Sequence, residues 1–301
     1  MYTTGTSYPQ FSNTRRQVLM DIYLSAEHAY HYIPQFSIDV ARDRVEQKKM
    51  NLVAGMLGSL LARSRPEEIQ LAAVENRVEP FWLLSASSRT VYDRVNTYTV
   101  PTGGAEVKSV TVLGQELPAV PQAKGGSAFT LTGVEHCVQE LRAWQTFDGI
   151  TGVKVDLLKY AGAAKTEIAD LSTFAPAGVL VVPPQVKANA VVRQVTAEVV
   201  QPVQNAQTIH EERVDIETVD LNFRPIYAFE YEWAAKNKRV VIEFDPLTGE
   251  MRTGGKRWSD QIKGLLTRDL IFDITADAFG TFVPGGSIAV KLVKAVVDRK
   301  K

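Results

Sequence analysis

The stretch Val74-Glu-Asn-Arg-Val-Glu-Pro-Phe-Trp82 recurs about 145 residues later as Val219-Asp-Leu-Asn-Phe-Arg-Pro-Ile-Tyr227. The valine, the acidic residue after it, the proline and the final aromatic residue fall at equivalent positions. An acidic pair and, further back, a helical pattern precede both copies, and a basic turn with another strand follows each. Because the order of the elements also matches, the sequence predicts an internal duplication.

Each copy predicts an extended entry ending at proline, then a helix, a strand, the proline-containing strand, a turn and a further strand. The helices are expected over 37–61 and 187–200, where apolar residues recur at helical spacing. One helix on a small sheet buries little apolar area, so we expect the copies to share a core. The predicted fold is α+β, with two tandem helix-plus-antiparallel-sheet units and a helical C-terminal segment.

Proline and glycine clusters separate these elements and suggest the boundaries of the units. The expected organisation is an N-terminal arm (1–30), a first α+β unit (31–117), a linker and helical connection (118–178), a second α+β unit (179–255) and C-terminal helices (256–301).

Two further helices are expected outside the repeat. Thr132-Gly-Val-Glu135 fits a capping box, in which a hydroxyl and a carboxylate satisfy free amides at a helix start. That helix would continue to Trp144. The last helix would begin at Ser287, and its basic end, Asp298-Arg-Lys-Lys301, suits a helix C-terminus.

Composition places few limits on function. Lysine and arginine balance aspartate and glutamate at 34 each, so the net charge gives no general attraction to nucleic acid or anionic lipid. The single cysteine, Cys137, cannot form an intrachain disulfide, which suits a reducing compartment. No secretory signal and no uncharged apolar run of membrane-spanning length are recognisable. A cytoplasmic location without a membrane span is therefore expected.

The second copy ends in Arg239-Val-Val-Ile-Glu-Phe-Asp-Pro-Leu-Thr-Gly-Glu250, a strand followed by a Thr-Gly-Glu turn. With the helix before it, the segment 187–251 resembles PepSY-like modules. This resemblance implies a non-catalytic binding or regulatory module, and it brings no functional residues with it. The first copy lacks the Thr-Gly-Glu turn.

The chain shows no recognisable catalytic motif, and no cofactor or metal is expected. The segment 249–256 lacks the spacing of a phosphate-binding loop, and no nucleophile elbow is present. His28 and His31 could share a helix face, but nothing nearby supplies a third metal ligand. Asp215 and Glu217 alternate on one strand, where solvated charges are common. An enzyme with an unfamiliar site stays open, although the balance favours none.

Two functional hypotheses follow. The first is a non-enzymatic protein-interaction or scaffold protein, in which the apolar C-terminal segment binds a protein partner or a second copy through Phe272, Phe279, Phe282, Val283, Ile288 and Leu292. The second is a nucleic-acid-associated protein that uses the basic and aromatic residues Arg252, Lys256, Arg257 and Trp258, although the balanced net charge does not support it.

Overall fold

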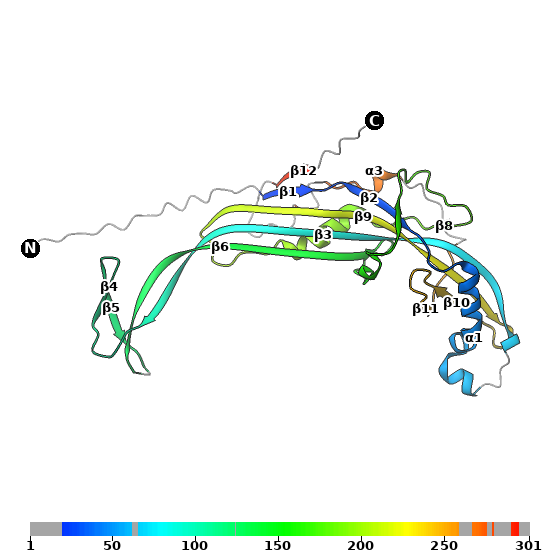
Figure 1. The fold of residues 1–301 in the computed structure, drawn as a ribbon, viewed down its shortest axis with the longest axis horizontal. Helices are drawn as coiled ribbons and strands as arrows, with labels where there is room; N and C mark the ends of the chain where they lie inside the picture. Colours follow the sequence, from blue (N-terminus) through cyan, green and yellow to red (C-terminus); the bar gives the residue numbers. More distant parts are fainter. Residues whose placement is uncertain are drawn as a thin grey trace, which may run out of the picture.

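Three unusually long antiparallel strands form the backbone of the molecule (Figure 1). The computed structural model describes residues 20–61, 66–123, 125–258, 267–275, 279 and 290–294. The long strands lie side by side in the order β9-β3-β6 within a 12-stranded mixed sheet. They are β3 (Ile69–Pro101), β6 (Ser127–Asp148) and β9 (Thr208–Trp233).

Shorter strands extend this sheet. The strands β1 (Met20–Leu24) and β2 (Glu27–Tyr32) pair with β9 in parallel. The strand β10 (Lys238–Phe244) pairs with the C-terminal end of β9 in antiparallel orientation, and β11 (Met251–Thr253) pairs with β10. At the far end of β6, β4 (Ser109–Val112) and β5 (Gln115–Pro121) make a hairpin. The remaining strands are β7 (Lys165–Glu167), β8 (Leu180–Val181) and β12 (Val290–Lys294).

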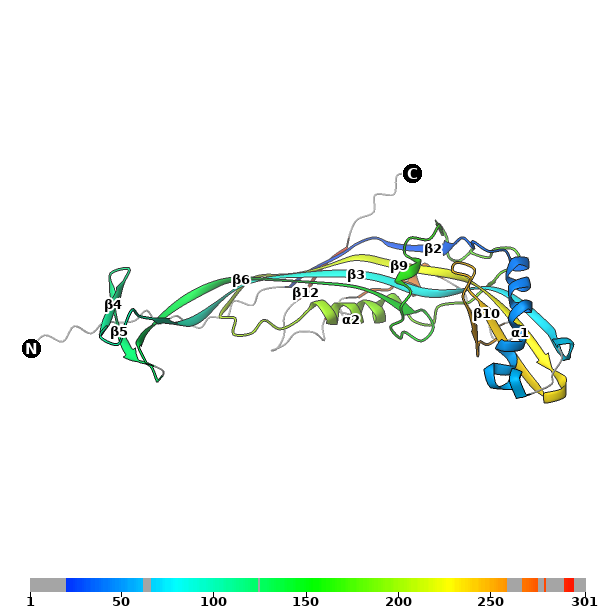
Figure 2. The same ribbon diagram turned by 60° about the horizontal axis from the view of Figure 1, so that its bottom comes forward.

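Two helices of more than one turn pack on the described sheet, and Figure 2 shows them well apart from each other along it. The helix α1 (Ile38–Leu61) packs near β9 and β10, whereas α2 (Ala188–Val199) lies across β3 and β6 and buries Val191, Val192 and Val195. The helix α3 is a single turn (Arg268–Ile271), and 3-10 turns occupy Pro66–Glu68, Leu158–Tyr160 and Ala234–Lys236. Across the described ranges, every helix is too short or too polar to cross a membrane.

The predicted tandem α+β fold with a helical C-terminal segment is wrong, because strands dominate the molecule and one sheet runs through both copies of the repeat. The capping-box segment from Thr132 to Trp144 belongs to β6, which pairs with β3 without a register shift. Long-range pairing therefore overrides a local helix signal. At the C-terminal end, Val290–Lys294 form β12, which pairs in parallel with β1. The helices over 37–61 and 187–200 are confirmed as α1 and α2.

The two repeated prolines lie within long strands without disturbing the central β3–β9 pairing. Pro80 faces the β6 side of β3, just beyond the end of β6, where its carbonyl accepts a bond from Gly149. Pro225 lies opposite Val78, whose carbonyl points away towards Val182. At both prolines the backbone nitrogen, which carries no hydrogen, therefore faces away from the β3–β9 ladder. The ladder loses no hydrogen bond, which is the condition for a proline within a strand.

The repeated stretches pair directly with each other. Glu79 and Arg224, which are equivalent in the repeat, stand opposite one another in the antiparallel β3–β9 ladder and form an ion pair of 2.9 Å. About this point, each stretch meets the entry segment of the helix that precedes the other stretch. Trp82 donates its Nε1–H to the carbonyl of Val186 (3.0 Å), just before α2. Tyr227 donates its hydroxyl to the carbonyl of Phe36 (3.1 Å), just before α1.

A matching turn follows each outer strand. In Asp148-Gly-Ile-Thr-Gly152 and Asp245-Pro-Leu-Thr-Gly249, the last glycine donates to the aspartate carbonyl, at 2.9 and 2.8 Å. The entry segments of the opposite helices bond to the second residue of these turns, Gly149 and Pro246. A Thr-Gly turn therefore follows the first copy as well, beyond the expected first unit, with Val153 where the second copy has Glu250. Each copy of the repeat therefore packs against the helix entry that precedes the other copy, and both copies belong to one sheet.

Replacing Gly249 by alanine should destabilise the fold by about 1–2 kcal/mol, the usual cost of a left-handed conformation for an L-residue. Its φ is +77°, and an added Cβ would lie 3.3 Å from the ring of Phe36. Gly162 is the control, because its surroundings are open and its φ is ordinary. Urea unfolding of Gly249→Ala and Gly162→Ala measures the difference. Equal midpoints for the two variants would contradict the assigned turn.

Candidate functional site

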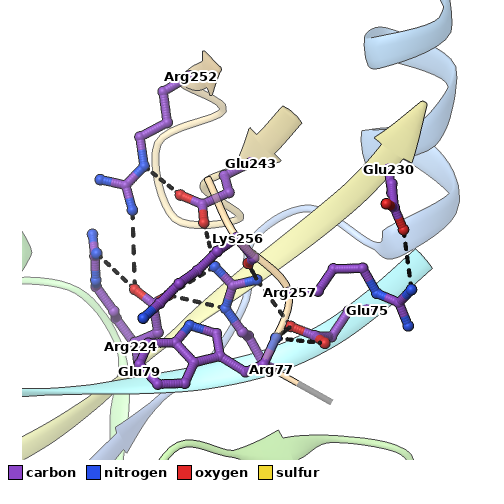
Figure 3. A network of polar contacts seen from close by, with 10 residues as sticks. Glu75, Arg77, Glu79, Arg224, Glu230, Glu243, Arg252, Lys256 and Arg257 are labelled. Carbon is purple, nitrogen blue, oxygen red and sulfur yellow. Dashed lines mark hydrogen bonds and ion pairs between the residues drawn. The ribbon is translucent and has the colours of Figure 1, made fainter. Parts of the chain in front are cut away.

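A buried cluster of charges lies where β3, β9 and β10 run side by side (Figure 3). At its centre, Arg77 is fully buried and donates from Nε to Glu79 (2.9 Å) and from Nη1 to Glu75 (3.0 Å). A further bond runs from its Nη2 to Glu243. The guanidinium is thus surrounded by three carboxylates, an arrangement that keeps a buried charge satisfied.

The strand pattern places these side chains together. Glu75, Arg77 and Glu79 alternate along β3, so they share one face of the sheet. Glu243 reaches the same face from β10, two strands away. Ala228 of β9 lies between Glu75 and Glu243 in the ladder, and its small side chain leaves room for the guanidinium between them.

Further arginines extend the cluster. Arg224 donates to Glu79 (2.9 Å) and Arg252 donates to Glu243 (2.5 Å). Burial alone would raise the pKa of Glu79, but the charges of Arg224 and Arg77 outweigh it and hold the pKa below its ordinary value of 4.5. Glu79 is therefore a carboxylate at neutral pH.

A neutral amide in place of Glu79 gives a pH test of this cluster. Since the pKa of Glu79 is lower in the folded chain than its ordinary 4.5, its contribution to stability is complete above pH 4.5 and is lost as pH falls through the lowered value. Glu79→Gln should be less stable than the native chain at pH 7, and the two should converge on acidification. Urea unfolding from pH 7 to 3 measures this.

The control for that series is Glu232→Gln, which removes an exposed carboxylate with a surface partner, Arg239. It should change stability by less than about 1 kcal/mol at any pH. If the difference in free energy of unfolding between Glu79→Gln and the native chain stayed constant down to pH 3, the assigned ionisation of Glu79 would be contradicted.

The structure brings together the four residues predicted to bind nucleic acid, but both arginines face carboxylates of the chain. Besides the contact of Arg252 with Glu243, Arg257 pairs with Glu230 at 3.0 Å. Lys256 lies over the ring of Trp258, at 3.7 Å, and the backbone amide of Trp258 donates to Glu75. These carboxylate partners were missed because strand pairing brings them to the cluster: Glu243 through the β10–β11 hairpin, and Glu230 and Glu75 through β9 and β3. The nucleic-acid hypothesis stays a prediction.

Beside the cluster is a cavity of about 400 Å³. Basic groups of Lys159, Arg224 and Arg252 line it together with the acidic groups of Glu243 and Asp245. The hydroxyl of Tyr160 donates to Asp245, and burial together with this bond raises the pKa of the tyrosine. Among the described lining residues there is no histidine, cysteine or serine. The cavity can therefore accept a polar group.

The residues predicted to bind a partner near the C-terminus lie in different places. Phe272 and Phe279 are buried in the main core, and Phe272 packs edge-on against Trp82 at 5.3 Å. Leu292 belongs to β12, opposite Ile22 of β1. Phe282, Val283 and Ile288 lie outside the described residues.

A second candidate site is the outer edge of β6, which sequence reasoning missed because it expected a helix there. Within the described part of the chain, no strand pairs with this edge over 130–145. β5 covers the edge only at 127–129, and Val155 bonds to it at Thr146. In between, the strand contains no proline and no bulge.

The free edge presents backbone groups and apolar side chains together. The carbonyl of Thr146 and the N–H of Asp148 both point outwards, so the even-numbered residues of this regular strand direct their N–H and C=O groups away from β3. The same residues form an open face, where Val134, Val138 and Trp144 are each 56% exposed. An unpaired edge of this length is a template for another strand.

Asp93 and two histidines form a hydrogen-bonded cluster on this open face. Asp93 of β3 contacts Nδ1 of His136 (2.7 Å) and Nε2 of His210 (2.8 Å). These two bonds hold the pKa of the Asp93 carboxyl below its ordinary value. The described residues show no group of histidine, cysteine and acidic side chains arranged to hold a metal ion.

Comparisons with protein-family models, curated proteins and solved structures find no match to this chain. The candidate sites are therefore interpreted from their geometry, and the PepSY-like resemblance stays a prediction.

Proposed function

We propose that this chain is a non-enzymatic protein-interaction or scaffold protein that binds a strand of a protein partner along the outer edge of β6. The observation that carries the proposal is the free edge over 130–145, with its outward backbone groups and exposed valines and tryptophan. Strand addition to such an edge derives affinity from main-chain hydrogen bonds and specificity from alternate side chains.

The rest of the molecule supports the arm, which is the long hairpin of β3 and β6 that carries this edge. The pairing of β3 with β9 and β6 is long, and α2 packs across β3 and β6 on one face. Natural proteins usually protect exposed edges with prolines, bulges, very short strands or charged side chains. Over 130–145 the described edge has no proline and no bulge, and its acidic residues Glu135 and Glu140 form ion pairs with arginines of β3. This combination favours a strand that is covered by a partner.

Site-specific photocross-linking in the native cell tests the proposal. A benzophenone amino acid at Val134, on the open edge, should cross-link a protein, either this chain or another. The same group at Val40, which is 41% exposed on α1 at the other end of the molecule, is the control (Figure 1). Val138→Pro should abolish the cross-link, because it removes an outward N–H.

Val138→Thr, which keeps that N–H and the branched side chain, should retain the cross-link. No product at Val134, or the same products at Val134 and Val40, would contradict the proposed function.

A further inference from the structure

We propose that the strand received by the β6 edge is β6 of a second copy of this chain, antiparallel about a twofold axis at Val138. This inference rests on the proposed function and specifies the partner. The axis would stand normal to the sheet, so that two arms form one continuous sheet with both α2 helices on the same side.

The length of the free edge favours this arrangement. Antiparallel pairing centred on Val138 sets residues 131–145 of one copy against 145–131 of the other. It therefore uses nearly the whole free edge, which is limited by β5 at 127–129 and by the bond of Val155 at Thr146. A centre at Leu141 would leave only 137–145 free to pair.

The hydrogen-bonding pattern agrees with the same centre. Even-numbered residues direct their backbone groups outwards, and this pairing sets even residues against even residues. Val138 faces its own counterpart, and Val134 faces Arg142 of the second copy. Directly opposed residues of this kind exchange both N–H···O bonds in an antiparallel ladder.

The directly opposed side chains are compatible with this centre. His136 would face Glu140 of the second copy, twice by symmetry, and no two carboxylates and no two lysine or arginine side chains would be directly opposed. Moving the centre by two residues would set Glu140 against its own counterpart, and cross-strand like charges are destabilising. His136 is mainly exposed and contacts Asp93 through Nδ1.

On the opposite face of the sheet, the pairing would set odd-numbered residues against odd-numbered residues. Leu141 and Ala143 pack partly against the cluster that contains α2. The second copy would set its Glu135 beside Leu141 and its Gly133 beside Ala143.

Spin-label distances in the full chain test both the pairing and its centre. With Cys137→Ser as background, a label at Val138→Cys should lie next to its counterpart, because the opposed Cα atoms are roughly 5.5 Å apart. A label at Thr132→Cys should be roughly 41 Å from its counterpart at 3.4 Å per residue, whereas a centre at Leu141 would give roughly 61 Å. Dilution with unlabelled chain should remove both signals.

Sedimentation equilibrium completes the test. The native chain and Val138→Thr should be dimers, and Val138→Pro should be a folded monomer with unchanged circular dichroism, because β3 does not use that N–H. A native chain that stays monomeric at about 100 μM, or distances that do not centre on Val138, would overturn the inference. A cross-link from Val134 to a different protein would leave the proposed function standing and reject only the second copy as its partner.

Discussion

Replacing Arg77 by methionine should lower the free energy of unfolding by about 3–5 kcal/mol, the usual effect of removing one partner from a buried ion pair. The guanidinium is fully buried between Glu75, Glu79 and Glu243, and it also donates to the carbonyl of Lys256 at 3.1 Å. Methionine fills similar space but leaves those carboxylates without their central cation. Urea unfolding at pH 7 measures the loss.

The matched control is Arg213→Met. Arg213 forms its ion pair with Asp215 on the surface of the same sheet, and its side chain is 45% exposed. Exposed pairs of this kind contribute less than about 1 kcal/mol. If both methionine variants lost the same small amount of unfolding free energy, the charge cluster would not stabilise the fold.

Trp82→Ala should lower the free energy of unfolding by a comparable amount, about 3–5 kcal/mol. The indole is fully buried, packs edge-on against Phe272, and donates to the carbonyl of Val186. Alanine would leave a cavity between β3 and the entry to α2. Chemical denaturation followed by circular dichroism measures the effect.

Two variants separate the contributions at Trp82. Trp82→Phe keeps much of the packing but loses the bond to Val186, so it should cost less than the alanine variant. Val40→Ala, on the exposed side of α1, should change stability by about 0.5 kcal/mol or less. A Trp82→Ala variant as stable as Val40→Ala would mean that the exchanged contact between the repeat copies does not hold the molecule together.

Local patterns predicted part of the fold. The apolar spacing over 37–61 and 187–200 gave helices that the structure confirms as α1 and α2. The strand-like pieces of each copy were recognised, but β3 and β9 join them through Pro80 and Pro225. The strands can continue through these prolines because the central β3–β9 ladder does not use an N–H at either position.

The partners of each element could not be predicted, because pairing depends on contacts between distant residues. A single-sequence pattern cannot show that β3 pairs with β9, so the tandem arrangement was the simplest expectation. The same limit hid the carboxylates around Arg77. For the same reason β6 was not predicted. Thr132 and Glu135 fit a helix cap locally, and only the pairing with β3 shows that they belong to a strand.

The central claim is that β6 is a strand with one edge paired to β3 and the other edge free for a partner. Residue-resolved amide hydrogen exchange tests it, with the chain diluted until it is monomeric. Over 132–145, odd-numbered amides should exchange slowly and even-numbered amides fast, and the even ones should become protected as the concentration rises. Uniform protection in the monomer, or uniformly fast exchange along the segment, would contradict it.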